Sequence, residues 1–239
     1  MASISVAMAV YNGEQYLPEQ LDSILMQLEP QDEIVVSYDK SKDGTWALLQ
    51  AYREKHPQIR VLENQNPGIN GNFNNAIAAC KGDYIFICDQ DDRWAENKRS
   101  AVLETFAKTG ADMVIHNGVH IDPAGNTISE PFFTLHRIGD GKLKNILKPR
   151  YSGCCTAFTR AMAEKIMPMP MNLDAYDHWI GTVGEFMGKI AYEERILLYH
   201  RLHDNNVTPV STRSLGVIAR ARTNLLWQLC RRALRERRK

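Results

Sequence analysis

Residues 82–94, GDYIFICDQDDRW, run from an apolar segment directly into a group of carboxylates. The apolar residues 84–88 have the composition of a buried strand. Asp89, Asp91 and Asp92 follow at once, and such side chains need water, a cation or a polar partner. The stretch therefore predicts a central strand that delivers acidic side chains to its own carboxyl end.

Segments with strand and helix patterns alternate on the N-terminal side of this stretch. The expected strands are 4–10, 32–38 and 59–62, and the expected helices are 17–28, 45–55 and 73–80, with 64–72 as a turn-rich loop. This alternation predicts a Rossmann-like α/β fold, in which a mostly parallel central sheet is flanked by helices. Such sheets bind ligands beyond the carboxyl ends of their strands. Tyr11 and Asp39 stand at two of these ends, and the aspartates stand at a third.

The alternation loosens after Trp94. The expected helices are 96–108, 160–167 and 174–187, and the expected strands are 111–117, 153–158 and part of 188–206, with a hairpin at 121–128 and an irregular basic segment at 131–150. We find no internal repeat and no low-complexity linker. One continuous α/β domain followed by a terminal helix is the expected organisation.

The overall composition is typical of a globular protein, with 239 residues, 44% hydrophobic residues and a formal net charge of +1. No stretch reaches the roughly 18 apolar residues of a membrane span, and the N-terminus lacks the basic region of a signal peptide. The five cysteines have no metal-ligand spacing, which favours a reducing compartment. We therefore expect a cytoplasmic protein with no nucleic-acid partner.

Basic residues are concentrated at the C-terminal end. Nine basic residues and one acidic residue lie between positions 211 and 239, and the segment reads as a basic amphipathic helix. Such a helix suits an anionic membrane surface, but Arg222 falls on the apolar face and favours docking on the protein itself. The apolar face holds Leu215, Ile218, Leu225, Leu226, Leu229 and Ala233, and the opposite face holds Arg220, Arg231, Arg235 and Arg238.

Asp89 and Asp91 are separated by one residue, so their carboxylates can face the same volume. Mg²⁺ and Mn²⁺ prefer oxygen ligands and leave positions open for phosphate groups. The alternative is a solvated acidic turn in which Asp91 or Asp92 caps the next helix. Asp39 has two interpretations as well: it could accept an N–H group of a pyrimidine base on which Tyr11 stacks, or it could belong to a simple turn.

Five motifs in this order resemble family 2 glycosyltransferases with the GT-A fold. They are SISVAMAVYNGEQYLPEQLDSILMQ (3–27), DEIVVSYDKSKDGT (32–45), NPGINGNFNNAIAACKGDYIFICDQDDRW (66–94), DAYDHWIG (174–181) and YHRLHDNN (199–206). The resemblance is continuous to about residue 95 and patchier to about residue 209. It implies one GT-A domain at 1–210, with a nucleotide-sugar-binding half at 1–95 and an acceptor-binding half at 96–210, followed by the basic amphipathic helix at 211–239.

The resemblance assigns donor-binding roles residue by residue. It implies that Tyr11 and Asp39 hold the nucleotide base of the donor, and it adds Ala9, Asn72 and Gln90 to the donor-binding positions. Tyr38 and Lys40 depart from the family pattern, in which an aspartate and a glycine are common. Because Asp39 is retained, recognition of a base is still expected.

Metal binding and catalysis are assigned in the same way. The resemblance implies that Asp91 binds Mn²⁺ or Mg²⁺, that Asp89 lies near the ribose and the metal, and that His203 reaches the metal or the diphosphate. Asp177 takes the position of the general base that deprotonates the acceptor. The alternatives are a helix N-terminal carboxylate for Asp177 and a structural histidine for His203, while His178 is expected to pack rather than to react.

The implied function is inverting, metal-dependent transfer of one sugar from a UDP-hexose, UDP-HexNAc or dTDP-rhamnose donor. The implied acceptor is a lipid-linked glycan in bacterial O-antigen, capsule or exopolysaccharide synthesis, with peripheral contact between residues 214–239 and the cytoplasmic face of the inner membrane. The Gln-x-x-Arg-Trp segment of processive synthases is absent, which favours transfer of a single sugar. The altered loop at Tyr38 and Lys40 keeps an alternative open, a catalytically weakened nucleotide-binding subunit of a glycan-assembly complex.

Overall fold

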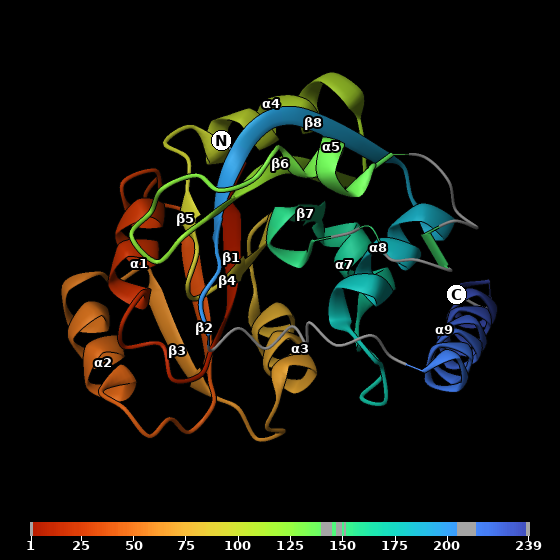
Figure 1. Cartoon of the computed structure of the whole chain (residues 1–239), viewed down its shortest axis with the longest axis horizontal. Helices are drawn as coiled ribbons and strands as arrows, with labels where there is room; N and C mark the ends of the chain where they lie inside the picture. Colours follow the sequence, from red (N-terminus) through yellow and green to blue (C-terminus); the bar gives the residue numbers. More distant parts are fainter. Residues whose placement is uncertain (1, 140–144, 147–149, 151, 205–213, 238–239) are drawn as a thin grey trace.

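One eight-stranded sheet runs through the protein, in the order β3-β2-β1-β4-β7-β6-β8-β5 (Figure 1). The computed structural model describes residues 2–139, 145–146, 150, 152–204 and 214–237. The strands are β1 (Ile4–Val10), β2 (Glu33–Tyr38), β3 (Ile59–Glu63), β4 (Tyr84–Asp89), β5 (Arg93–Trp94), β6 (Met113–Ile121), β7 (Thr156–Thr159) and β8 (Ile190–Arg201).

The sheet is parallel in the half that the N-terminal segments build. Strands β3, β2, β1 and β4 are parallel neighbours, and β6 is parallel to β8. The short strand β7 joins the halves by pairing antiparallel with both β4 and β6, and β5 pairs antiparallel with β8. The sequence prediction of a mostly parallel sheet flanked by helices is confirmed, and the curled arrangement is that of the GT-A fold.

Helices cover both faces of the sheet. Successive side chains of a strand point to opposite faces, so both faces carry apolar side chains that must be buried. In β1, Val6, Met8 and Val10 belong to the core on one face, and Ala7 belongs to the core on the other. The first face packs against α1 (Leu17–Leu25), α2 (Thr45–Lys55) and α4 (Lys98–Thr109), and the second against α3 (Ile69–Ala79), α7 (Arg160–Ile166) and α8 (Tyr176–Met187). A short helix, α5 (Phe132–His136), follows β6.

The segment 131–150, expected to be irregular, contains the short helix α5, and two further local predictions were wrong. Residues 69–72 were expected in a loop, but α3 begins at Ile69, where Gly68 adopts a positive φ of 106° and its N–H donates to Asp39. Residues 153–155 were expected in a strand but form a 3₁₀ turn, whose Cys154 carbonyl accepts a hydrogen bond from the buried Lys98. In both places a contact distant in sequence fixes the backbone.

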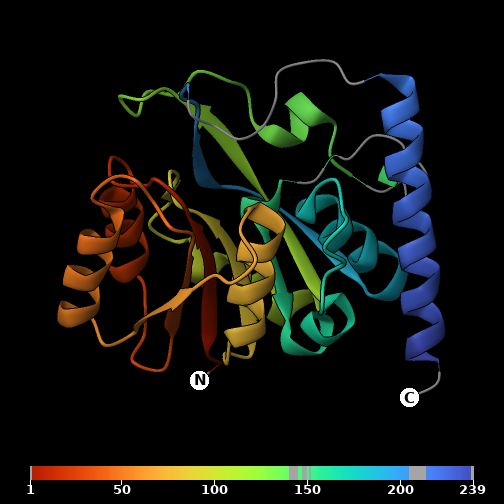
Figure 2. The same cartoon turned by 90° about the horizontal axis from the view of Figure 1, so that it is seen from below.

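The C-terminal helix α9 (Leu215–Glu236) packs against α8 (Figure 2). Leu225 and Leu229 are buried as expected, but Leu226, expected on the same face, is 41% exposed. Arg232 lies on the buried side instead, and its guanidinium donates to the carbonyl groups of Lys165, Met167 and Pro168 at the end of α7. Residues 211–213 and 238–239 lie outside the described part of the chain.

None of the helices formed by the described residues is both long and apolar enough to cross a membrane.

Candidate active site

Tyr11 stands at the carboxyl end of β1 with 47% of its surface exposed. The amide side chain of Gln90 holds the backbone of Tyr11, accepting from its N–H at 2.8 Å and donating to its carbonyl at 2.8 Å. The Tyr11 ring is thereby left free to stack on a flat ligand. Ala9, in register with Asp89 on β4, lies just inside this edge and is half-buried.

Asp39 lies at the end of β2, beside Tyr11, and is 7% exposed. Its carboxylate accepts hydrogen bonds from Asn64 Nδ2 at 2.7 Å and from the Gly68 N–H at 2.9 Å. These two donors fix the orientation of the carboxylate, and each carboxylate oxygen has a second lone pair. Asp39 can therefore still accept a hydrogen bond from a ligand at the strand end.

Asn72, in the first turn of α3, is buried beneath the end of β1. Its Nδ2 donates to the Val10 carbonyl at 3.2 Å, and its Oδ1 has no hydrogen-bond partner among the described residues. Asn72 thus lies under the candidate donor site rather than at its surface.

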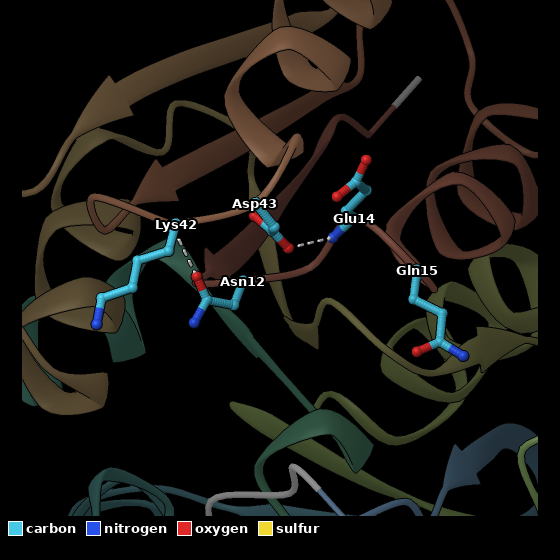
Figure 3. A pocket seen from close by; sticks show the side chains of 5 residues that line it. All are labelled: Asn12, Glu14, Gln15, Lys42 and Asp43. Carbon is cyan, nitrogen blue, oxygen red and sulfur yellow. Dashed lines mark hydrogen bonds between the residues drawn. The ribbon is translucent and has the colours of Figure 1, made fainter.

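The loops that carry Tyr11 and Asp39 are cross-linked to each other. Asn12, at a positive φ of 48°, accepts from the Lys42 N–H at 2.9 Å, and Asp43 accepts from the Glu14 N–H at 3.1 Å. Figure 3 shows these side chains around an open polar hollow of about 470 Å³, which Gln15 completes. The hydrogen bonds hold both strand ends in a fixed relation.

Asp91 and His203 meet at the end of β4, although they are 112 positions apart. Asp91 Oδ2 lies 2.9 Å from His203 Nε2, and both side chains are largely buried. The His203 ring also packs against Tyr16, with ring centroids 4.9 Å apart. One carboxylate oxygen and one imidazole nitrogen are ligands that Mn²⁺ accepts, so this pair fits a divalent cation.

Asp89 and Asp92 are the other members of the acidic cluster, defined here as Asp89, Asp91 and Asp92. Burial, together with the neighbouring carboxylates, raises the pKa of both Asp89 and Asp92 above the usual range. Asp92 is fully buried and accepts from the Arg201 N–H at 3.1 Å, so it supports the loop from within. A cation beside this cluster would relieve the repulsion between its charges.

Arg201 is a site residue that sequence reasoning missed. It is 1% exposed, and its guanidinium donates to the Asp91 carbonyl at 3.1 Å and to Glu19 Oε2 at 2.5 Å. It also donates to the Asp122 and Pro123 carbonyls and covers the Tyr16 ring. Arg201 therefore fixes the backbone of the acidic loop. Its place in the motif YHRLHDNN, three positions after the apolar run 196–198 ends, was the available signal.

Asp177 lies in the first turn of α8 and is partly exposed. Burial raises its pKa to about 6, with Asp174 adding to the rise, while the backbone N–H of His178 donates to Asp177 at 2.7 Å and opposes it. A carboxylate with such a pKa is mostly ionised at neutral pH and still basic enough to accept a proton from a hydroxyl group.

Tyr176, also missed by sequence reasoning, connects α8 to the acidic cluster. Its ring stacks on Phe73 with centroids 4.0 Å apart, and its hydroxyl donates to Asp89 Oδ1 at 3.5 Å. Gly153 leaves the space for this ring, because a Cβ at that position would collide with the Tyr176 ring and hydroxyl. The structure thereby brings the helix that carries Asp177 to the same edge as the acidic cluster.

His178 packs, as expected, and does not face the site. It is 3% exposed, its Nε2 lies 3.0 Å from the Asn145 carbonyl oxygen, and its Nδ1 lies 3.1 Å from Arg222 Nη1. Burial next to Arg222 lowers the pKa of His178 to about 4. His178 thus links the helix that carries Asp177 to α9.

Comparison with known proteins gives a consistent result. The family model described as glycosyl transferase family 2 matches residues 5–167. An uncharacterized glycosyltransferase of Nostoc sp. is 28% identical over 85% of the chain and 66% of its own length. The putative teichuronic acid biosynthesis glycosyltransferase TuaG of Bacillus subtilis is 30% identical over 50% of each protein. The chain thus spans less than two thirds of either relative.

Solved structures share the fold. The crystal structure of residues 1–349 of Staphylococcus aureus TarS, in complex with UDP-GlcNAc, superposes with a TM-score of 0.72. The match covers 94% of this chain and 66% of the TarS chain, at 18% sequence identity.

Proposed function

The chain belongs to glycosyl transferase family 2, and on that premise we propose that it transfers one sugar from a nucleotide-diphosphate donor to a hydroxyl group, with inversion at the anomeric carbon. The observation that carries the proposal is the contact of Tyr176 with Asp89, because it brings the helix bearing a basic carboxylate to the acidic cluster. The TarS structure, which holds UDP-GlcNAc, supports a nucleotide-sugar donor.

The donor would lie across the carboxyl ends of β1, β2 and β4. The Tyr11 ring would stack on the base, and Asp39, held by Asn64 and Gly68, would accept a base N–H group. Gln90 fixes the Tyr11 backbone, so the ring meets the base in a set position. Ala9 and Asn72 would shape the floor of this site. A UDP-sugar and a dTDP-sugar both present a pyrimidine N–H to Asp39.

Asp91 and His203 would hold Mn²⁺ or Mg²⁺, with Asp89 beside the ribose. A divalent cation there supplies compensation for charge that develops on a departing diphosphate. Arg201 keeps the Asp91 backbone in place from below, through its hydrogen bond to the Asp91 carbonyl.

Asp177 would accept the proton of the acceptor hydroxyl as the new glycosidic bond forms. Inversion requires this base and the leaving group on opposite sides of the anomeric carbon, which develops oxocarbenium character as in glycoside hydrolysis. On this proposal residues 1–95 hold the donor, 96–210 hold the acceptor and 211–239 are an appended helix. The name of the teichuronic acid relative supports a bacterial surface glycan as the acceptor class.

We propose further that the acceptor is lipid-linked and that α9 contacts an anionic membrane. The face of α9 that does not touch the protein body carries Trp227, 54% exposed, and Leu234, 57% exposed. Arg231 stacks over Trp227 with 4.6 Å between the guanidinium carbon and the ring centroid. An apolar and basic outer face suits the boundary between acyl chains and anionic head groups.

The transfer reaction is tested by release of nucleotide from UDP-, dTDP- and GDP-sugars in the presence of Mn²⁺, with and without a lipid-diphosphate-sugar acceptor. We expect release with one donor class, stimulation by the acceptor, and loss of both on chelation of the metal or in Asp91→Ala. Nucleotide binding without release for any donor would contradict transfer and favour the alternative of a binding subunit.

The membrane contact is tested separately by sedimentation with liposomes of anionic or neutral lipids. Replacing Trp227 and Leu234 together by alanine should weaken binding to anionic liposomes by about tenfold, since affinity scales with the apolar area buried in the interface. Trp46→Ala is the matched control, because Trp46 is 39% exposed on α2. Equal binding of both variants and the unmodified protein would contradict the contact.

A further inference from the structure

Three side chains from separate segments come together at Asp92, the buried member of the acidic cluster. Asp92 comes from the loop after β4, Cys154 from the 3₁₀ turn before β7, and His200 from β8. One potential ligand atom from each lies within 4.8 Å of the other two. None of the three belongs to the pair formed by Asp91 and His203.

Asp92 has an unsatisfied oxygen in this group. The residue is 0% exposed, its Oδ1 accepts from the Arg201 N–H, and no N–H or O–H group among the described residues donates to its Oδ2, which leaves the Cys154 thiol as the neighbouring donor to this carboxyl. Lys98, also buried, directs its Nζ to the Cys154 carbonyl at 3.0 Å and not to this oxygen. A buried carboxylate oxygen without a partner is costly, so the position favours a cation.

His200 is oriented by a second histidine. Its Nδ1 lies 3.1 Å from Nδ1 of His120, the residue opposite it in the register of β6 and β8. The His120 ring in turn packs on the buried Phe132. Histidines that bind metals commonly have one ring nitrogen fixed in this way, which sets the direction of the other.

We propose that Asp92, Cys154 and His200 form a binding site for a thiophilic divalent cation of the zinc type, separate from the site at Asp91 and His203. Carboxylate, thiolate and imidazole together are ligands of Zn²⁺, whereas a sulfur ligand disfavours Mg²⁺ and Mn²⁺. On binding, the Cys154 thiol and the Asp92 carboxyl, whose pKa burial raises, both release their protons to solvent, so that the cation meets a thiolate and a carboxylate. The two positive charges of the cation are then balanced by one carboxylate and one thiolate.

Binding requires the three ligand atoms to move closer together. Bonds of roughly 2.0–2.3 Å in a tetrahedral zinc site put the ligand atoms about 3.5 Å apart. In the structure the three potential ligand atoms lie within 4.8 Å of one another. His200 is partly exposed, which provides an entry side for the cation and for a fourth ligand such as water. The bound cation would tie the loop of the acidic cluster to β8 and to the turn before β7.

The neighbouring Cys155 offers a matched control. It is as buried as Cys154 and interacts with both the Cys154 thiol and His116, but it lies outside the three-residue group. Cys230 is exposed on α9 and would contribute an unrelated thiol, so the experiment uses the full chain carrying Cys230→Ser. Cobalt(II) is the probe, because its thiolate charge-transfer absorption reports directly on sulfur ligation.

We expect one equivalent of Co²⁺ to give the thiolate absorption, and Zn²⁺ but not Mg²⁺ to remove it. Cys154→Ser should abolish the absorption, while Cys155→Ser and Asp91→Asn should retain it. Asp92→Asn keeps every thiol and should weaken binding, which guards against a folding defect in Cys154→Ser. His120→Phe should weaken binding by about 10–100-fold, as expected for a residue that orients a ligand.

The absence of thiolate absorption in the starting protein would overturn the site. Loss of absorption in Cys155→Ser equal to that in Cys154→Ser would overturn it as well. Neither outcome depends on sugar transfer, so failure of this site and failure of the proposed function are distinguishable.

Discussion

The two halves of the sheet position their polar residues in different ways. In the half built from β1, β2 and β4, the main candidate residues lie at strand ends: Tyr11 and Asp39 directly follow β1 and β2, and Asp89 is the last residue of β4. In the half built from β6, β7 and β8, the candidate residues reach the site through contacts distant in sequence. His203 meets Asp91 after 112 positions, and Tyr176 meets Asp89 after 87. The position of the candidate residues is thus set by the strand ends in the first half and by tertiary packing in the second half.

This difference suggests a division of chemical labour. Strand ends in a parallel sheet are rigid and hold a donor in one place, which suits binding. The helix α8 approaches from the other half and carries the proposed base, Asp177, which suits a step that occurs only when an acceptor is present. If the division holds, substitutions in the first half should change donor affinity, and substitutions in the second half should change turnover.

The largest effect is expected for Asp177→Asn. The amide cannot accept the acceptor proton, so turnover should fall by about 10²–10⁴-fold, the contribution of general base catalysis. Donor affinity, measured by calorimetry with the nucleotide diphosphate, should stay unchanged. Asp174→Asn is the control, because Asp174 is exposed three positions before Asp177 and should alter the pKa of Asp177 without removing its carboxylate. Full turnover in Asp177→Asn would contradict the role of Asp177 as the base. It would also contradict the division into a donor-binding half and a half that controls turnover.

Asp39→Asn should show the opposite pattern. It replaces a charged acceptor of a base N–H group by a neutral amide, so donor affinity should fall by about 10–100-fold, as for loss of a charge-assisted hydrogen bond. Turnover at saturating donor should change little. Asp83→Asn is the control, since Asp83 accepts from Ser3 at the amino end of β4, on the opposite edge of the sheet. Equal losses in both variants would indicate a stability effect instead.

The same division explains how far the sequence predicts the fold. Strand β1 and helix α2 begin and end where the apolar pattern and the turn residues place them, because local chemistry decides both. The start of α3 was missed because Asn and Gly are poor helix formers. That start is held by Asp39 and by Asn70 Nδ2, which donates to the Leu173 carbonyl. No local pattern contains these contacts.

In the second half the missing information concerns burial. An arginine in a sequence is expected at the surface, yet Arg201 and Arg232 are buried against backbone carbonyl groups. Spacing of cysteines and histidines gave no hint that Cys154 and His200 converge with Asp92, because each comes from a different segment. Pattern reading detects neighbours along the chain, and these groups are neighbours only across the sheet.

A pH profile should sharpen the comparison further. Because burial raises the pKa of Asp177 to about 6, turnover at saturating donor and metal should fall about tenfold per pH unit below that value. The same shift favours the protonated carboxyl in the folded state, so the contribution of Asp177 to the free energy of unfolding decreases as pH rises toward 6. Turnover that stays constant between pH 7 and about pH 4 would contradict the assignment.

Tyr176→Phe should have the smallest effect, and it tests the contact that joins the two halves. The ring would stay stacked on Phe73, but the hydrogen bond to Asp89, already long at 3.5 Å, would be lost. We expect kcat/KM for the donor to decrease by about threefold to tenfold, as for the loss of one weak hydrogen bond.

Tyr52→Phe is the matched control for that change. Tyr52 also donates its hydroxyl to an aspartate, Asp22, at 2.9 Å, but the pair links α2 to α1 away from the strand ends. Its loss should lower the free energy of unfolding by about 1 kcal/mol and leave kinetics unchanged. If Tyr176→Phe behaves in the same way, the hydroxyl only supports packing, and α8 must be placed at the acidic cluster by the Phe73 stack and Gly153 alone.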